Sequence, residues 1–177
     1  GRRVSRRVTT DDVTRAAERR IRRTHRSRWT LALGMAVGAF ILDQVIKAVV
    51  RNNMDEAGSG IELTPFLRID RYTNDGIAFG LFPGRQGVVA TLTLIALAGI
   101  ALALVSLVRQ NLWGAAGAGL LVGGSLGNLV DRLRFGGVTD FIDFDHWPAF
   151  NIADSAITIG AILIIMGLME ATEEPDR

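Results

Sequence analysis

The fold of this 177-residue chain is decided by residues 87–108, GVVATLTLIALAGIALALVSLV, which run for 22 positions without a charged side chain. About 20 apolar residues are enough for a helix to cross a hydrocarbon core roughly 30 Å thick. Three further segments have a similar character, at about residues 30–50, 112–130 and 152–169. The sequence therefore predicts an α-helical integral membrane protein with four transmembrane helices.

The stretches outside these helices divide the chain into regions. Residues 1–29 form a basic tail, residues 30–170 the four-helix domain and residues 171–177 a second, short tail. Within the domain, residues 51–86 carry apolar side chains in partial alternation, followed by Asn74-Asp75-Gly76. This pattern is typical of short strands joined by a tight turn. We therefore expect a small extracytoplasmic β segment on the outer membrane surface.

The distribution of arginines indicates how the chain is oriented. Residues 1–28 contain eleven arginines and three acids, a net charge of +8, whereas residues 51–86 contain four arginines and five acids. Residues 131–150 contain two arginines and four acids. Positively charged flanks remain on the cytoplasmic side of a membrane. Both termini are therefore expected to be cytoplasmic, and the connections 51–86 and 131–151 to lie outside.

The basic tail also limits the choice of partner. Beside a membrane helix, its arginines most simply contact anionic lipid headgroups and establish topology. We therefore expect membrane lipids, and no nucleic acid, as its partner. Two interpretations of residues 9–25 stay open, an amphipathic helix with Thr10 as its cap or a segment that is disordered in solution. No chemistry is assigned to the tail.

Small residues indicate which helix faces pack together. Gly119, Gly123 and Gly127 recur at every fourth position of one predicted helix, and Gly34 and Gly38 have the same spacing in another. No hydrophobic force draws helices together in lipid, so a face of small residues gains its contacts by letting backbones approach closely. We interpret the first set as a packing seam. It is not a nucleotide-binding loop, because it lies inside a membrane helix and no strand precedes it.

Charged side chains inside membrane segments need partners. Asp43 and Lys47 are four positions apart, share a helix face and can pair with each other. We favour a structural ion pair near the outer end, with Gln44 bonding a neighbouring helix, over a direct catalytic role.

A second polar group lies at the outer end of the third predicted helix and contains Asn128, Asp131 and Arg132. Two interpretations stay open for this group. The side chains either cap and anchor the helix end or organise a nearby site.

Asp140 precedes the last predicted helix, and Asp154 lies in its first turn. Asn151 stands three residues before Asp154, which is typical of an N-terminal capping arrangement. Taken alone, Asp154 is therefore a helix-start acid, and Asp140 an acid at the membrane interface.

Elimination leaves few other catalytic groups. The chain has no cysteine, which excludes thiol proteases, thiolate metal sites and disulfides. Of the two histidines only His146 is expected outside, so a serine–histidine–aspartate site on that side could use this histidine alone. No HExxH zinc motif is present. Lys47 is the only lysine and is expected to pair with Asp43. Asp140 and Asp154 are thus the best candidates for a hydrolytic dyad, with a proton-coupled transporter or a membrane scaffold as the alternative class.

Five sequence boxes, taken in order, resemble one family. They are Asp43-Gln44-x-x-Lys47, 74–79 (NDGIAF), 123–132 (GGSLGNLVDR), 137–142 (GVTDFI) and 150–157 (FNIADSAI). Together they closely resemble bacterial lipoprotein signal peptidase, the type II signal peptidase. The resemblance covers residues 30 to 169, and five boxes in the right order make it highly specific.

This resemblance implies a membrane-embedded aspartic endopeptidase that removes the signal peptide from a prolipoprotein, cutting just before a cysteine that carries diacylglycerol. Asp140 and Asp154 match its catalytic pair. Other matching positions, around the site or elsewhere in the motifs, are Asn74, Asn128, Arg132, Asn151, Asp43 and Lys47. No metal or organic cofactor is implied. The implied location is the bacterial cytoplasmic membrane with the active site near the outer face, and we expect a monomer.

The chain departs from the family pattern at a few positions. Asp75 and Ile77 lie in a box that more often reads Asn-Thr-Gly-Ala-Ala-Phe, and Thr139 replaces a commoner valine beside Asp140. The added charge of Asp75 is expected to alter substrate preference near the mouth of the site. Neither departure removes a catalytic atom.

Overall fold

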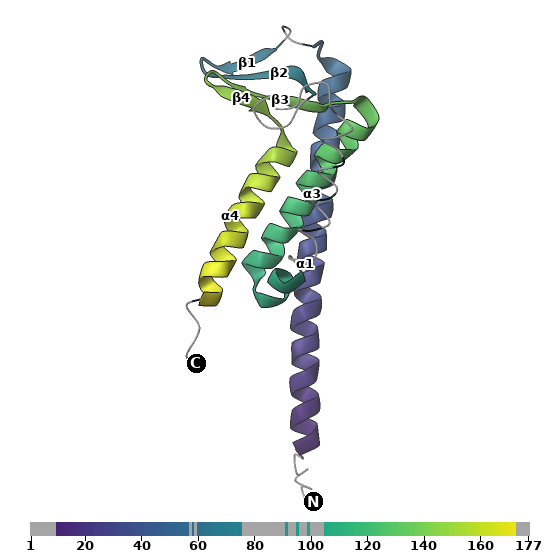
Figure 1. The fold of residues 1–177 in the computed structure, drawn as a ribbon, viewed down its shortest axis with the longest axis vertical. Helices are drawn as coiled ribbons and strands as arrows, with labels where there is room; N and C mark the ends of the chain where they lie inside the picture. Colours follow the sequence, from purple (N-terminus) through teal and green to yellow (C-terminus); the bar gives the residue numbers. More distant parts are fainter. Residues whose placement is uncertain are drawn as a thin grey trace, which may run out of the picture.

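The computed structural model describes residues 10–56, 58, 60–75, 91, 95, 99 and 105–172. Within this part of the chain, three long helices are α1 (Thr10–Asn53), α3 (Leu112–Phe135) and α4 (Ile152–Thr172). The strands are β1 (Ile61–Thr64), β2 (Leu67–Asn74), β3 (Val138–Phe144) and β4 (Trp147–Phe150). Figure 1 shows the sheet across one end of the helices, whereas α1 begins and α4 ends toward the other end.

The helices bury charged side chains and expose apolar ones, which is the reverse of a water-soluble protein. Large apolar residues such as Leu33 and Ile165 are 65% and 57% exposed, whereas Lys47 and Asp131 are fully buried. An apolar surface around a polar interior suits a lipid solvent, since lipid does not penalise exposed leucine but does penalise exposed charge. The described helices therefore have the polarity of membrane helices.

Two helical segments in the described residues are long and apolar enough to cross a membrane, Ala17–Asn53 and Ile152–Glu170. Most of the predicted helix over residues 87–108 lies outside the described residues, although residues 105–110 are helical. The four-helix arrangement therefore stays a prediction.

The basic tail is helical where it is described. Helix α1 has 44 residues, which at 1.5 Å per residue makes it about 66 Å long, twice the thickness of a hydrocarbon core. Residues 10–29 of the predicted tail are its first part, so the helical interpretation holds for them, and residues 1–9 lie outside the described residues. Thr10 is itself helical, so it is not a cap residue that precedes the helix.

Glycines of α3 allow close packing on two sides. A Cβ on Gly119 or Gly123 would collide with the backbone of α1 at Ala32 or Ala36, which confirms the predicted seam. On the other side, a Cβ on Gly124 would lie 2.5 Å from the carbonyl oxygen of Ala153 in α4. The second seam was not predicted from the sequence. Helix α3 therefore lies between α1 and α4.

The glycines of α1 do not take part in this packing. Nothing among the described residues lies within 4 Å of a Cβ placed on Gly34 or Gly38. Glycines at every fourth position therefore do not mark a contact face among the described helices in this case, because Ala32 and Ala36 of α1 face α3 instead.

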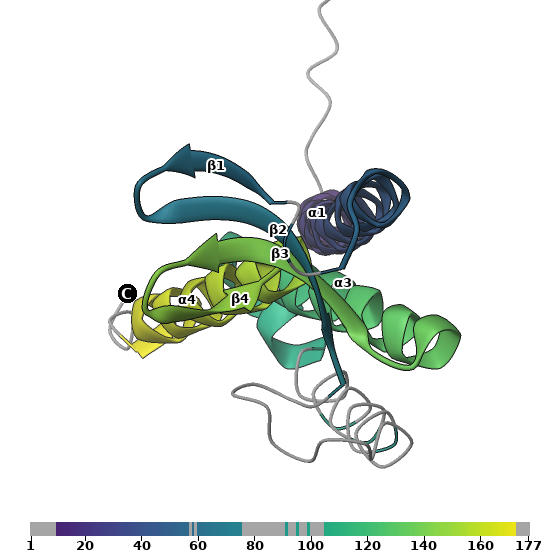
Figure 2. The same ribbon diagram turned by 90° about the horizontal axis from the view of Figure 1, so that it is seen from above.

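The sheet is antiparallel in the order β1-β2-β3-β4. Seen from above in Figure 2, β3 and β4 lie over α4. The structure differs from the sequence prediction in two respects, the position of the turn and the presence of two further strands. The hairpin turn joining β1 to β2 falls at Pro65 and Phe66, whereas Asn74 pairs with Val138 at the end of β2. Strands β3 and β4 were not predicted, because a seven-residue strand and a four-residue strand carry little periodic signal.

The junction between α3 and β3 needs a glycine. Helix α3 ends at Phe135, and Gly136 then takes a φ of 78° while its N–H bonds to the carbonyl oxygen of Arg132. A left-handed residue that closes the last helical turn is a common helix terminator. This turn directs the chain into β3, which carries Asp140 across the end of the helices.

Candidate active site

Asp140 lies in β3 with its side chain almost completely buried, at 3% exposure. Asn74 at the end of β2 donates from Nδ2 to Asp140 Oδ2 at 3.0 Å. Asn151, just before α4, donates from Nδ2 to Asp140 Oδ1 at 2.6 Å. Each carboxylate oxygen of Asp140 is therefore bound by an amide from a different element.

Asp154 lies in the first turn of α4 and forms a reciprocal cap with Asn151. The N–H of Asp154 donates to Asn151 Oδ1 at 2.9 Å, and the N–H of Asn151 donates to Asp154 Oδ2 at 3.2 Å. This pairing satisfies donors that the start of a helix leaves without an intrahelical partner. The predicted capping arrangement is confirmed, and it also holds the Asp154 carboxylate beside the residue that binds Asp140.

Asn128 on α3 joins Asp154 to the interior of the protein. Its Nδ2 donates to Asp154 Oδ1 at 2.7 Å, and its Oδ1 accepts from Lys47 Nζ at 2.8 Å. Because a lysine ammonium can only donate, it requires the oxygen of Asn128 and so directs the Nδ2 group toward Asp154. Asn151 Nδ2 also donates to Asn128 Oδ1, at 3.2 Å. Lys47 thereby determines the orientation of the amide that binds Asp154.

The predicted pair of Asp43 and Lys47 is confirmed. Lys47 Nζ lies 2.9 Å from Asp43 Oδ2, and both side chains are fully buried. Gln44 bonds α3 as expected, donating to the carbonyl oxygen of Gly127 and to Asp131 Oδ1, both at 3.2 Å. Asp43 Oδ1 also accepts the N–H of Ala153 in the first turn of α4, at 2.9 Å. These contacts hold α1, α3 and the start of α4 together beneath the two aspartates.

The two aspartates line one cavity of about 320 Å³, together with Asn74, Asn128 and Arg132. The cavity extends along α4 to Ile157 and Thr158 and is bordered by all four residues of β4, Trp147, Pro148, Ala149 and Phe150. Sequence reasoning did not predict the β4 wall. Phe150 alone carried a signal, because it opens one of the five sequence boxes.

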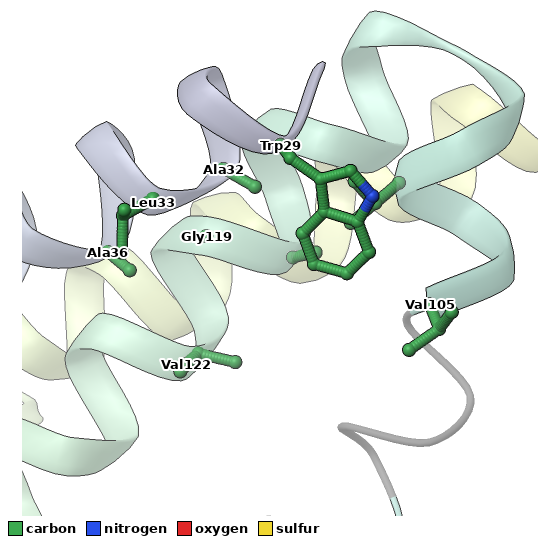
Figure 3. Close-up of a pocket in the computed structure, with 9 residues that line it drawn as sticks. Trp29, Ala32, Leu33, Ala36, Val105, Gly119 and Val122 are labelled. Carbon is green, nitrogen blue, oxygen red and sulfur yellow. The ribbon is translucent and has the colours of Figure 1, made fainter. Parts of the chain in front are cut away.

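A second cavity of about 210 Å³ lies between α1 and α3 and is lined almost entirely by apolar groups. Figure 3 shows Trp29, Leu33, Val105 and Val122 around it. None of its lining residues carries an ionisable group, so this cavity offers nothing for acid–base chemistry. The cavity that contains Asp140 and Asp154 is therefore the candidate active site.

Burial alters the acidity of Asp140. Removal of its carboxylate from water raises the pKa of Asp140 to about 6, and the nearby charge of Asp154 acts in the same direction. Hydrogen bonds from Asn74 and Asn151 and the charge of Lys47 act in the opposite direction without cancelling the effect. Asp140 is thus suited to holding a proton near neutral pH.

The predicted site residues come together from five elements, α1, β2, α3, β3 and α4 with the residue before it. Lys47 reaches Asp154 and Asn151 through Asn128. Asp75 is exposed at the end of β2, and Ile77 lies outside the described residues. Within the described part of the chain, no group of three acidic or histidine side chains is arranged to hold a metal ion. Acid–base chemistry by two carboxylates is what the arrangement can perform.

Solved structures with the same fold define the class of the protein. One bacterial membrane enzyme matches with a TM-score of 0.70 and 36% identity, over 82% of this chain and 92% of the other. A second bacterial membrane enzyme matches with a TM-score of 0.66 and 38% identity, over 77% and 91% of the two chains. The fold is therefore that of a bacterial membrane enzyme.

Sequence comparison identifies the family. The sequence model of signal peptidase (SPase) II matches residues 35–170. A lipoprotein signal peptidase of Pelotomaculum thermopropionicum is 37% identical over 77% of this chain and 90% of its own length. That of Aeromonas hydrophila is 36% identical over 86% and 96%. The chain belongs to the signal peptidase II family of aspartic peptidases.

Proposed function

We propose that the protein removes the signal peptide from diacylglyceryl-modified prolipoproteins and cuts just before the lipidated cysteine. Membership of the signal peptidase II family supports the reaction, and the names of its relatives support the substrate. The observation that carries the proposal is that carboxylates from β3 and α4 line one cavity and are both bonded to Asn151.

In this proposal Asp140 and Asp154 form the catalytic pair and share one proton. Asp154 is the base, because the start of α4 and the donors from Asn151 and Asn128 stabilise its negative charge. It takes a proton from a water molecule as the water oxygen attacks the scissile carbonyl carbon. Asp140 holds the shared proton and donates it to the developing oxyanion. When the tetrahedral intermediate collapses and the C–N bond breaks, Asp154 gives the proton that it took from water to the leaving amine, and Asp140 takes back a proton from the oxygen that re-forms the carbonyl.

The surrounding polar residues act as positioning groups in this scheme. Asn74 and Asn151 hold Asp140, and Asn128 holds Asp154 in the orientation that Lys47 determines. Arg132 lines the cavity beside the two aspartates, where its guanidinium can bind a substrate carbonyl oxygen. Because the amides are already bonded before substrate enters, little reorganisation is needed during the reaction.

The location of the site explains the choice of substrate. The cavity is lined by Ile157 of α4 and by Phe150 at the end of β4. Lipid chains of the substrate can remain in the bilayer while the peptide bond reaches Asp140. We infer that the site faces the outside of the cytoplasmic membrane, that both termini are cytoplasmic, and that a monomer in contact with membrane lipids suffices. Anchoring in the membrane then supplies part of the orientation that the reaction requires.

Detergent-purified protein and a diacylglyceryl-modified precursor test the proposal. The wild-type protein should release the signal peptide, and Asp140→Asn and Asp154→Asn should each lower the rate by at least about 100-fold, because each removes an acid–base group. Glu62→Gln, which removes an exposed carboxylate from β1, is the matched control and should cleave normally. Full cleavage by either aspartate variant rejects the dyad. Equal cleavage of a precursor without diacylglycerol rejects the proposed substrate.

A further inference from the structure

Arg51, in the last turn of α1, reaches the start of β3. Its Nη1 donates to Thr139 Oγ1 at 2.9 Å and lies 3.4 Å from both carboxylate oxygens of Asp131 on α3. The N–H of Thr139 donates to Asp131 Oδ2 at 3.0 Å. Three elements therefore meet at the residue that directly precedes Asp140.

We propose that Arg51 is a positioning residue for Asp140 and acts through Thr139. The inference rests on the proposed function, in which Asp140 is catalytic. Successive side chains in a strand point to opposite faces, so the direction of Thr139 determines the direction of Asp140. Arg51 and Asp131 hold both the hydroxyl and the backbone N–H of Thr139. This leaves Asp140 directed toward Asn74 and Asn151.

Arg51 is itself held in place on two sides. Its guanidinium lies 4.3 Å from the centre of the Phe135 ring, and its carbonyl oxygen accepts from Arg71 Nη1 at 3.3 Å. Only 15% of the Arg51 side chain is exposed. Asp131 is fully buried and is also bonded by Gln44, so it offers Arg51 and Thr139 a fixed acceptor.

The hydroxyl of Thr139 is what Arg51 binds. A valine at this position could not accept the hydrogen bond from Arg51. Thr139 is 5% exposed, so its hydroxyl needs a partner inside the protein. Arg51 therefore supplies the donor that the buried hydroxyl of Thr139 needs, and Thr139 supplies an acceptor for Arg51.

Four proteins test the inference with the diacylglyceryl-modified precursor: wild type, Arg51→Leu, Thr139→Val and the double variant. Arg51→Leu leaves a buried hydroxyl beside Asp140 without its donor, and it should lower kcat by about 10-fold to 100-fold with KM within about 3-fold. The double variant removes both members of the Arg51–Thr139 hydrogen bond and should recover part of that loss, because matched removal of a pair costs less than removal of one member. The part that remains reflects the ion pair of Arg51 with Asp131, which the second substitution does not restore.

Arg134→Leu is the matched control. Arg134 also lies over the Phe135 ring, at 5.4 Å, but it is exposed in the last turn of α3. It should keep wild-type kcat. Thermal unfolding of all five proteins in detergent shows whether Arg51 and Thr139 are energetically coupled, independently of activity.

The outcomes separate the inference from the proposed function. If Asp140→Asn cleaves normally, the proposed function fails and the catalytic part of the inference fails with it. If the dyad is required but Arg51→Leu keeps kcat within about 2-fold per folded molecule, the inference is wrong. It is equally wrong if the losses of the two single variants simply multiply in the double variant, since independent sites behave additively in free energy.

Discussion

Asn151 shows how one side chain can serve both folding and chemistry. Its Oδ1 accepts the N–H of Asp154 as a helix cap, and its Nδ2 donates to Asp140 and to Asn128. The capping bond is local and could occur at the start of many helices. The bonds to Asp140 and Asn128 require that β3 and α3 reach the same point, which a local sequence motif does not specify.

At the residue scale, Asp140 should lower the stability of the folded protein near neutral pH. Its pKa is raised from 3.8 to about 6 by burial, so the folded state binds this proton more tightly than the unfolded state does. Its contribution to stability is fully present below about pH 4 and is lost as the pH rises through about 6. A rise in pKa of this size corresponds to roughly 3 kcal/mol.

The stability of Asp140→Asn relative to the wild type should therefore be higher at pH 7.5 than at pH 4, by about 1 to 3 kcal/mol, because only the wild-type side chain changes its charge between these pH values. The NH2 group of the variant faces the donors of Asn74 and Asn151 at both pH values, so its cost does not alter this difference. Thermal unfolding in detergent at the two pH values measures it. Glu62→Gln controls for the loss of a negative charge and should show no such dependence on pH, since Glu62 is exposed. A relative stability that is equal at both pH values contradicts the argument.

At the element scale, the position of α3 depends on glycine. Its two seams let the backbones of α1 and α4 approach so closely that no Cβ fits at Gly123 or Gly124. Close approach brings Asp43, Asn128 and Asp154 into one network. A wider spacing between helices would break these bonds, because hydrogen bonds weaken steeply beyond about 3.2 Å.

Gly123→Ala should destabilise the protein by about 2 kcal/mol or more, because its methyl group collides with the backbone of Ala36. Gly34→Ala is the matched control, since nothing among the described residues lies within 4 Å of the added carbon. It should be neutral or stabilising by up to about 1 kcal/mol, because alanine favours helix. Thermal unfolding in detergent compares the two variants. Equal losses in both would show that backbone propensity, rather than the seam, explains the glycines.

At the scale of the whole molecule, the sheet lies at one end of the helices and the start of α1 lies at the other (Figure 1). In the orientation that we propose, the first part of α1 carries the arginines that the positive-inside rule retains in the cytoplasm. The long helix would then link charge on one side of the membrane to a site near the other side.

The absence of cysteine allows a direct test of this topology with single cysteines. Glu62→Cys, on β1, should react with a membrane-impermeant maleimide in intact cells. Arg15→Cys and Thr172→Cys, exposed near the start of α1 and at the end of α4, should react only after the cells are opened. Prolipoprotein processing in the same cells controls for correct insertion. Labelling of all three in intact cells would reject the proposed orientation.

The sequence by itself predicted the apolar helices, a glycine packing seam on the helix over residues 112–130, the pair of Asp43 and Lys47 and the cap at Asn151. These features are local or periodic, because their members lie within one helix or a few residues of each other. Helical spacing is enough to place such members on one face.

Only the tertiary structure decided how these parts meet. It placed Asp140 between Asn74 and Asn151, gave Asn128 its orientation through Lys47, and added the β4 wall and the contact of Arg51 with Thr139. Arg51 and Thr139 are 88 positions apart, and no short-range pattern links residues at that separation. Their contact depends on how α1, α3 and the sheet pack together, which in lipid is determined by the fit of small residues and by buried hydrogen bonds.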